Sequence, residues 1–461
     1  MKRLLAIILA MILTVTTLAS CSKVVNNEDG SDVDGESESY GGSDAFTDSS
    51  NESNMNNENI GDNTSTGESD VPVQGAPTFN VKESTPGLKF ALNEDKLSYT
   101  LVSRGDAASK DIVIDGHRGL PVTKIGYSAF GDDETITSVK LGDYVEIIDD
   151  QAFSMCSALA SVTFGNGVKF LGDYAFRYCH ALKSIELGKN LEVIKYGAFY
   201  DCKNLVNIKA YGKIRIIEDD AFKRTGYSAV GSNWKNKVLY IGTNLIQAEG
   251  TISGTYEIEP DTTCIGGLAF YGCASLSGVV IPDSVHSIGL KAFANTTALN
   301  NITIGNGVTY IGESAFINAG YYKNTSNWSG NTLYIGNYLV EAKIALSGAY
   351  SVVSGTKAIA DMAFVNCVNV TSVAIPDSVV HIGQYAFLDC TKLANVSIGS
   401  GVKEIGSYAF KDCSALKGIT VKKTDGWRAG NIQISADKFL TKEDAAINIG
   451  IVYADKVLTR S

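Results

Sequence analysis

The sequence is poor in the residues on which much site chemistry depends, with four His, three Trp and seven Pro among 461 residues. So few imidazoles leave little material for proton transfer or for histidine-ligated metal. Clustered positive charge is also missing, because residues 82–461 hold 36 basic and 37 acidic residues. Phosphate binding requires clustered Lys and Arg, so we expect no nucleic-acid partner.

Motifs for catalysis and metal binding are absent as well. The sequence has no G-x-S-x-G, no phosphate-binding loop of the G-x-x-x-x-G-K-[ST] type, no H-E-x-x-H and no calcium loop. Adjacent carboxylates do occur, as in Asp149-Asp150 and Asp219-Asp220, but a glycosidase needs two carboxylates that converge across a cleft. We therefore expect no catalytic residue, no cofactor and no metal site. An exported enzyme acting on carbohydrate or peptide is the alternative.

The first 20 residues predict export. Lys2 and Arg3 precede an apolar stretch over residues 4–18, which is typical of a secretory signal peptide. No later apolar run reaches the length of a membrane-spanning helix. Residues 18–21, Leu-Ala-Ser-Cys, resemble the lipobox of bacterial lipoproteins, in which the cysteine receives a diacylglyceryl group and becomes the new N-terminus. The resemblance implies a signal peptide over residues 1–20 and lipidation at Cys21.

Residues 21–80 form a region of different composition, dominated by Ser, Asn, Gly, Asp and Glu. Residues 22–81 contain 13 acids and one lysine, Lys23. Such a segment has too little apolar surface to offset the entropy of ordering, so we expect a disordered tether. The tether would hold the rest of the chain away from the membrane.

The pair Ala-Phe recurs along the remaining chain, at intervals of 23 residues except for two of 48. An aliphatic residue stands five positions before every Phe, as Ile288 does before Phe293. A fixed period in the twenties with an apolar ladder predicts a solenoid, in which no unit can bury its apolar side alone. The eleven positions are Phe130, Phe153, Phe176, Phe199, Phe222, Phe270, Phe293, Phe316, Phe364, Phe387 and Phe410.

Each unit reads L-x-x-V-x-I, then Gly or Pro, then V-x-x-I-G-x-x-A-F-x-x-C. Apolar residues two apart, as in Ile302 and Ile304, predict a strand with one buried face, so the units would form a parallel sheet along one side. The V-x-x-I-G stretch is either a second short strand or a turn, and the Ala-Phe stretch could make one helical turn.

These units resemble the leucine-rich repeats of BspA-like surface proteins. IGQYAFLDCTKL at 382–393 carries the resemblance, as do LYIGTNLIQAE at 239–249 and LYIGNYLVEAK at 333–343 in the two longer units. The resemblance implies an N-terminal cap over residues 81–121, a leucine-rich repeat solenoid over 122–421 and a C-terminal cap over 422–461. It also implies a surface adhesin without catalytic residues.

Seven of the nine cysteines stand three positions after a repeat Phe, so they would form a column along the solenoid. Neighbours in such a column, as Cys156 and Cys179 would be, have parallel Cβ directions, which does not suit a disulfide. No C-x-x-C pair suggests a metal. We expect buried free thiols.

Two surfaces are candidates for ligand binding. The sheet face carries small, weakly charged side chains, among them Thr303, Ser372 and Asn395, which leave a flat surface but also simply suit a curved sheet. The second 48-residue unit carries Tyr321 and Tyr322, and tyrosines often anchor interfaces. Trp234 and Trp328 are 94 residues apart in equivalent positions, which suggests packing instead.

Taken together, the sequence predicts a lipid-anchored leucine-rich repeat protein on the extracellular face of the bacterial cell, attached to the membrane through its N-terminal lipid. We expect it to mediate adhesion by binding a macromolecule: a host extracellular protein, a glycan or another bacterial surface. A structural spacer in the cell envelope is a further alternative.

Overall fold

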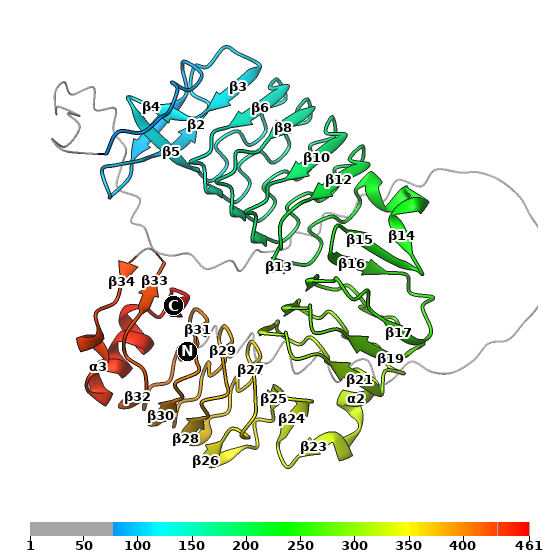
Figure 1. The fold of residues 1–461 in the computed structure, drawn as a ribbon, viewed down its shortest axis with the longest axis vertical. Coiled ribbons are helices and arrows are strands. Elements are labelled where there is room, and N and C mark those ends of the chain that lie inside the picture. The colour runs from blue at the N-terminus through cyan, green and yellow to red at the C-terminus, as the bar shows by residue number, and fades with distance from the viewer. Residues whose placement is uncertain (1–76, 431, 461) are drawn as a thin grey trace, which may run out of the picture. The chain divides into compact units, whose positions relative to one another are not determined.

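The computed structural model describes residues 77–430 and 432–460, all of which belong to one compact unit. The expected signal peptide, Cys21 and residues 21–76 of the expected tether lie outside the described residues. Each 23-residue repeat makes one coil of a parallel solenoid, with a longer strand on one side and a two-residue strand on the other (Figure 1). The predicted leucine-rich repeat solenoid is confirmed.

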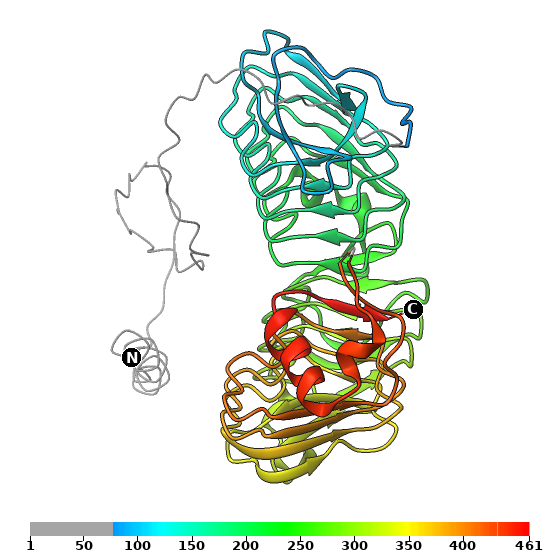
Figure 2. The ribbon, with the colours of Figure 1, turned by 90° about the vertical axis from the view of Figure 1, so that its left-hand side faces the viewer.

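The longer strands follow the predicted alternation. In β6 (Ser138–Leu141), Val139 and Leu141 are buried whereas Lys140 is exposed. Strands of neighbouring coils pair in parallel, with residues 23 apart opposite each other in the regular repeats (Figure 2). The column is divided into four sheets: β3 (Asp111–Ile114), β6 and β8 (Ser161–Thr163); β10 (Ser184–Leu187) and β12 (Asn207–Ala210); β17 (Gly254–Glu257), β19 (Leu276–Ile281) and β21 (Asn301–Ile304); β26 (Ser347–Ser351), β28 (Asn369–Ile375), β30 (Asn395–Ile398) and β32 (Gly418–Val421).

The V-x-x-I-G stretch forms the short strands, which settles the alternative between strand and turn. Each short strand ends on the aliphatic residue that stands five positions before the Phe, and this residue is buried in every coil. The strands are β7 (Ile147–Ile148), β9 (Phe170–Leu171), β11 (Val193–Ile194), β13 (Ile216–Ile217), β18 (Cys264–Ile265), β20 (Ser287–Ile288), β22 (Tyr310–Ile311), β27 (Ala358–Ile359), β29 (His381–Ile382) and β31 (Glu404–Ile405); the longer β5 (Leu120–Ile125) begins the column.

The Ala-Phe stretches form turns and not the helical turn that seemed possible from the sequence. The residues two before and two after each Phe have positive φ, as in Gln151 (56°) and Met155 (63°), and this left-handed conformation is incompatible with an α-helix. Three backbone N–H groups per turn donate to the next coil instead: Gln151, Phe153 and Met155 donate to the carbonyls of Asp173, Ala175 and Arg177. We call these segments the Ala-Phe turns.

The repeat phenylalanines stack face to face within three groups. Neighbouring rings lie 4.8 to 5.3 Å apart between centroids. The first stack runs from Phe130 to Phe222, the second from Phe270 to Phe316 and the third from Phe364 to Phe410. The repeat phenylalanines therefore stack from coil to coil within each group, and the stacking is interrupted at both 48-residue units.

Each 48-residue unit inserts an antiparallel three-stranded meander between two stacks. The first consists of β14 (Trp234–Lys235), β15 (Val238–Ile241) and β16 (Asn244–Ala248), and the second of β23 (Trp328–Ser329), β24 (Thr332–Ile335) and β25 (Tyr338–Ala342). All four residues of β15 are buried, because Leu239 and Ile241 join the apolar cluster of the first stack and Val238 and Tyr240 join the cluster that follows. This explains the continuous apolar run.

Short helices precede both meanders: the 3-10 helices η2 (Gly226–Ala229) and η3 (Gly231–Asn233) in the first unit, and α2 (Gly320–Lys323) with η4 (Thr325–Asn327) in the second. At the N-terminal end, β1 (Lys89–Leu92) pairs with β2 (Tyr99–Ser103), which pairs with β5, and β4 (Gly116–His117) also pairs with β5.

The C-terminal end contains the main helical segment: η5 (Ala436–Phe439), α3 (Lys442–Ile447) and a π-helical turn η6 (Asn448–Val452). The strand β33 (Trp427–Ala429) pairs with β34 (Ile432–Gln433) on one side and with β35 (Leu458–Arg460) on the other, and β35 pairs with β31. Across the described ranges, no helix has the length and apolar character needed to cross a membrane.

The eight cysteines of the described residues are free and buried, as expected. Burial raises the pKa of the Cys156 thiol to about 12. The Sγ of Cys156 lies 3.1 Å from the carbonyl oxygen of Phe130, and Cys179 makes the same contact with Phe153 at 3.2 Å. The thiols of Cys202, Cys390 and Cys413 also contact the Phe carbonyl of the preceding coil, so five thiols of the column make this contact.

Candidate functional site

The three sheet-face candidates lie on two different sheets. Thr303 is exposed on β21, whereas Ser372 on β28 and Asn395 on β30 are register partners in neighbouring strands. Asn395 is exposed and Ser372 half-buried. The structure therefore brings Ser372 and Asn395 together but does not place Thr303 beside them. Their role in binding stays a prediction.

Tyr321 and Tyr322 lie in α2, where both are half-buried and pack against the apolar core. Tyr321 Oη donates to the carbonyl oxygen of Tyr334 at 3.3 Å, and Tyr322 Oη donates to Glu341 Oε1 at 2.8 Å. These bonds attach the helix to the meander. The ring edges that remain exposed are the part available to a ligand, and the binding role of this pair stays a prediction.

The two tryptophans make equivalent contacts. Nε1 of Trp234 donates to the carbonyl of Ser228, and Nε1 of Trp328 donates to the carbonyl of Tyr322, both at 2.8 Å. Each bond closes the loop between the short helices and the meander. The shared geometry accords with the packing role suggested by their 94-residue offset.

A group of aromatic and basic side chains lies on consecutive Ala-Phe turns of the first stack. We call Tyr174, Arg177, Tyr178, Tyr200 and Arg224 the tyrosine-arginine surface. The Arg177 guanidinium lies over two rings, 4.7 Å from the centroid of Tyr174 and 5.0 Å from that of Tyr178. The Arg224 guanidinium lies 6.0 Å from the centroid of Tyr200, and Tyr178 meets Tyr200 edge to face. Stacking of this kind orders long side chains before a ligand arrives.

Positive charge exceeds negative charge at this surface. Asp201 is buried beneath it and contacts three basic groups: Arg224 Nε at 2.8 Å, Lys203 Nζ at 3.3 Å and His180 Nε2 at 3.4 Å. Among the described residues, Arg177 forms no ion pair with a carboxylate. One carboxylate therefore faces more basic side chains than it can neutralise.

A glycine makes room for one of the rings. A Cβ added at Gly197, which has φ of 56°, would come within 2.7 Å of the Tyr174 ring. The ring therefore lies directly over this glycine, and a larger residue there would displace it. The sequence analysis did not predict this surface. The pattern that could have indicated it is tyrosine close to the repeat Phe in two consecutive units, at positions 174, 178 and 200.

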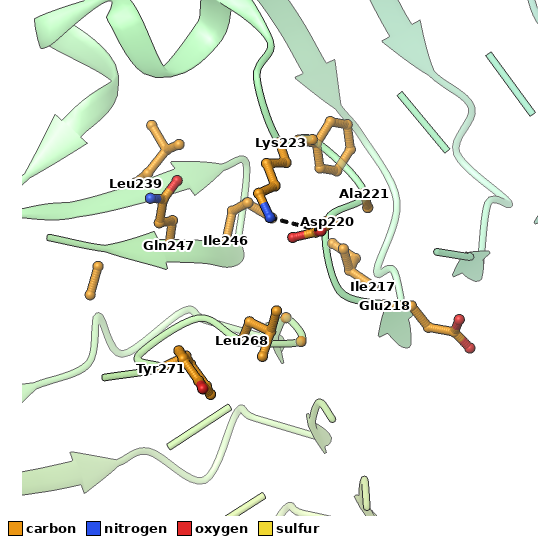
Figure 3. A pocket seen from close by; sticks show the side chains of 14 residues that line it. Ile217, Glu218, Asp220, Ala221, Lys223, Leu239, Ile246, Gln247, Leu268 and Tyr271 are labelled. Carbon is orange, nitrogen blue, oxygen red and sulfur yellow. Dashed lines mark hydrogen bonds and ion pairs between the residues drawn. The ribbon is translucent and has the colours of Figure 1, made fainter. Parts of the chain in front are cut away.

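Two clefts lie where the 48-residue units interrupt the stacks. The first has a volume of about 210 Å³, and Figure 3 shows Asp220 and Lys223 on one side of it, Leu268 and Tyr271 on the other, and Gln247 of the meander between them. The second has a volume of about 530 Å³ and includes Glu313, Glu341, Ile344, Asp361 and Met362. Most of their lining positions correspond at the 94-residue offset, so the clefts are a repeated feature.

A partly buried polar cluster joins residues on or next to short strands of distant coils, with Asp361 and His381 buried and Arg215 exposed. Tyr310 Oη donates to Asp361 Oδ2 at 2.7 Å, and Arg215 and His381 both approach Glu404, at 3.3 and 3.6 Å. Burial raises the pKa of Asp361 to about 7, and burial lowers the pKa of His381. Buried titratable groups of this kind make the free energy of unfolding depend on pH, whether or not they contact a ligand.

Among residues 77–430 and 432–460, no group of three or more His, Cys, Asp or Glu side chains is placed to hold a metal ion. The paired carboxylates Asp149-Asp150 and Asp219-Asp220 lie at the start of Ala-Phe turns, where Asp150 and Asp219 are half-buried. Burial raises the pKa of Asp150 and of Asp219, and the backbone N–H of Asp173 donates to Asp150. The carboxylate of Asp150 therefore has a structural partner in the next coil.

The comparisons with known proteins agree with this architecture. The family model of the BspA type leucine rich repeat region matches the chain in six copies, over residues 123–253, 263–349 and 357–426. No curated protein matches the sequence.

Solved structures of leucine-rich repeat proteins are similar to the chain. The T. pallidum leucine rich repeat protein TpLRR is 19% identical, with a TM-score of 0.29, over 51% of this chain and 90% of that one. A leucine rich cell surface protein from Faecalibacterium prausnitzii is 20% identical, with a TM-score of 0.27, over 75% and 95%. The pneumococcal vaccine antigen PcpA is 14% identical, with a TM-score of 0.26, over 75% and 82%.

Proposed function

The chain belongs to the BspA-type leucine-rich repeat family, and from this membership we propose that it is a non-catalytic binding protein of the bacterial cell surface. Its task would be adhesion, through a macromolecular ligand on a host or on another bacterium. The leader and the Leu-Ala-Ser-Cys tetrapeptide support export and a lipid anchor at Cys21. Two acyl chains on one residue would make that attachment stable.

The observation that carries the binding proposal is the tyrosine-arginine surface. Tyr and Arg are the side chains that most often dominate binding energy at interfaces. Here they are held by mutual stacking, with Arg177 between Tyr174 and Tyr178, so a ligand would order few side chains on binding. The excess of basic groups around Asp201 favours an acidic ligand surface.

Binding through this surface is tested by a pair of matched variants. Immobilised protein lacking residues 1–76 would be assayed against extracellular matrix proteins and against whole bacterial cells. Arg177→Ala with Tyr178→Ala should weaken binding about ten-fold, or about 1.4 kcal/mol. Tyr127→Ala removes a more exposed tyrosine, 62% accessible, from the first turn and should leave binding unchanged. Equal binding of the double variant and the parent would count against this surface.

A third variant changes the position of the Tyr174 ring and leaves the side chains of the tyrosine-arginine surface the same. Gly197→Ala keeps every side chain of the surface but pushes the Tyr174 ring away from its place. It should reduce binding while the Tyr178 and Arg224 side chains remain. If adhesion instead falls only with Tyr321→Ala and Tyr322→Ala, or with Ser372→Ala and Asn395→Ala, the binding surface is one of the two originally expected from the sequence.

The anchor is tested in the native bacterium. Cys21→Ala should abolish lipid attachment, so the variant should leave the detergent phase and enter the medium or remain unprocessed. A variant that still partitions into detergent as the parent does would argue against the lipoprotein assignment. Removing residues 22–76 should leave the affinity of purified protein unchanged and reduce adhesion of whole cells, because a tether sets reach and not contact.

A further inference from the structure

In each of the three stacks, backbone hydrogen bonds join successive Ala-Phe turns into a ladder, and each ladder has a first and a last turn. Inside a stack, every turn donates three N–H groups to the next: Gly197, Phe199 and Asp201 donate to the carbonyls of Asp219, Ala221 and Lys223. The turn around Phe222 is the last of the first stack, and the turn around Phe316 is the last of the second. At these two turns the same three N–H groups have no backbone partner within the described chain: those of residues 220, 222 and 224, and of 314, 316 and 318.

The other ends of the ladders are covered by the chain itself. The first turn of each stack accepts a hydrogen bond from a preceding segment: Arg104 N donates to Ala129 O at 3.0 Å, and Ala248 and Ala342 donate to Ala269 and Ala363 at 2.7 Å. At the last turn of the third stack, Tyr408 N donates to the carbonyl of Ala454 in the C-terminal segment, whereas the N–H groups of Phe410 and Asp412 have no backbone partner in the described residues. Where a ladder end is covered, backbone of another segment therefore supplies one hydrogen bond.

The two uncovered ends coincide with the two clefts. Asp220, Phe222 and Lys223 line the first cleft, and Ser314 and Ile317 line the second. Across the first cleft, the carbonyls of Gly267 and Tyr271 accept no backbone hydrogen bond in the described residues, and the equivalent carbonyls of Asp361 and Val365 are likewise without one. Each cleft therefore has open donors on one wall and open acceptors on the other.

The charges of the clefts limit what can accept from these N–H groups. The first cleft contains Glu218 and Asp220, and both are already paired, Glu218 with Lys195 and Asp220 with Lys223, the latter at 2.9 Å. The second contains Glu313, which has no ion pair among the described residues, together with Glu341 and the buried Asp361, and burial raises the pKa of both of these. Its lysine, Lys343, lies 4.3 Å from the centroid of the Trp328 ring. A free anion would be repelled by these carboxylates, whereas a neutral peptide carbonyl would not. A basic side chain would be attracted.

We propose that both clefts bind an extended peptide segment with lysine or arginine side chains, in the manner of a strand added to a sheet edge. Its carbonyls would accept hydrogen bonds from the open N–H groups of the last turn, and in the second cleft its basic side chains would meet Glu313 and Glu341. Small apolar side chains between them would contact Leu268, or Met362 and Ile344. Ile344 is 68% exposed although it is apolar.

The second cleft is the stronger site of the two. It has the larger volume and a carboxylate without an ion pair among the described residues, Glu313, and its Glu341 takes the place of Gln247. The inference does not depend on the tyrosine-arginine surface, which lies on the first stack and contributes no residue to the lining of either cleft.

Amide hydrogen exchange tests the proposal at the atoms concerned. The probe is a short acetylated and amidated peptide of alternating Lys and Val, added to the chain without residues 1–76. Saturating peptide should slow exchange about ten-fold at the amides of 314, 316 and 318, and less at 220, 222 and 224. The equivalent amides inside the stacks, 291, 293 and 295, are already bonded and serve as internal controls.

Charge variants complete the test. Glu313→Lys should weaken binding at the second cleft about ten-fold and leave the first unchanged, because Glu313 has no ion pair to lose among those of the described residues. Glu257→Lys places the same charge on the exposed face of β17, away from the clefts, and should change neither. Unchanged exchange in 291–295 shows that a variant is folded.

Three results would overturn the inference. They are equal protection by a Glu-Val peptide of the same length, absence of any protection at saturating Lys-Val peptide, and protection that grows with protein concentration without peptide. The last would mean that a second copy of the chain covers the ladder ends. None of them bears on binding by the tyrosine-arginine surface, which Arg177→Ala with Tyr178→Ala tests separately.

Discussion

The two 48-residue units share a backbone and differ in the side chains that face their clefts. Both contain the meander, the tryptophan bond to the short-helix region and a tyrosine that donates to the middle strand, from Tyr227 to Tyr240 O and from Tyr321 to Tyr334 O. Only the second unit places Tyr322, Glu341 and Asp361 where the first has Ser228, Gln247 and Gly267. The shared residues therefore maintain the array, and the differing ones are free to determine what each cleft contacts.

The largest expected loss of stability comes from a substitution in the phenylalanine stack between the two units. Phe293 is fully buried between Phe270 and Phe316, with ring centroids at 4.9 and 5.2 Å. Phe293→Ala should lower the free energy of unfolding by about 3–5 kcal/mol, because it leaves a cavity bounded by two coils. Phe222→Ala removes a ring with one stacked neighbour, beside the first cleft, and should cost less. Chemical denaturation of both variants measures the difference; equal losses would mean that the stack ends are as tightly packed as its middle.

The buried carboxylate of the second unit should make stability depend on pH. Burial raises the pKa of Asp361 to about 7, even though Tyr310 Oη and the Gln384 N–H both donate to it at 2.7 Å. The folded state then binds a proton that the unfolded state has lost, so stability should fall as pH rises from about 4 to about 7. A shift of this size corresponds to as much as about 4 kcal/mol.

Asp361→Asn checks this sign, because it keeps the shape and removes the charge. The variant should be more stable than the parent at pH 8 and should lose most of the fall between pH 4 and 7. His381 acts in the opposite direction, since burial lowers its pKa and costs stability as pH falls below about 6.5. The first unit has Gly267 at this position, so a fall that persists in Asp361→Asn would come from other groups.

The tryptophans should have intermediate and similar effects. Trp234→Phe and Trp328→Phe each remove a 2.8 Å hydrogen bond from a half-buried ring and should cost about 1–2 kcal/mol. Trp328 should be the more sensitive, because Lys343 and Tyr322 also contact its ring. Thermal unfolding of the pair measures this. A ligand affinity that changes while the melting temperature does not would instead assign Trp328 to a binding surface.

The smallest effect is expected on the sheet between the units. Thr303 is exposed on β21 and has no side-chain hydrogen bond among those of the described residues. Thr303→Ala should change the free energy of unfolding by less than about 0.5 kcal/mol. Measuring adhesion of the same variant then reports on ligand contact alone. A clear loss of binding with unchanged stability would restore the sheet face as a binding surface.

Much of the fold follows from spacing. A period of 23 with Ile five residues before Phe is satisfied by one coil per repeat, and both strand columns follow from the apolar positions. The conformation of the Ala-Phe turn cannot be predicted from spacing. Its left-handed residues, such as Met155 and Tyr178, belong to residue types that do not indicate a positive φ. The turn is maintained by three hydrogen bonds from the neighbouring coil, which a single unit cannot supply.

The candidate sites, too, have features that the sequence predicts and features that only the structure shows. Thr303, Ser372 and Asn395 could be placed on the sheet face from alternation alone. Their separation into two sheets depends on the inserted meander, whose two buried faces interrupt the column. The tyrosine-arginine surface could not be placed in this way. The left-handed form of one turn brings Arg177 over Tyr174 and Tyr178, and the stacking of neighbouring turns brings Tyr178 against Tyr200.

The sequence by itself determined the repeat, the burial of the Ile, Phe and Cys columns, and the existence of two irregular units, because each depends on a period that local residue types reveal. Only the tertiary structure decided where the ladders of N–H groups end, which side chains meet at the clefts, and that Asp361 is buried beside Tyr310. Those features arise where a coil has no neighbouring coil in register. The sequence of a single repeat carries no information on whether such a neighbour is present.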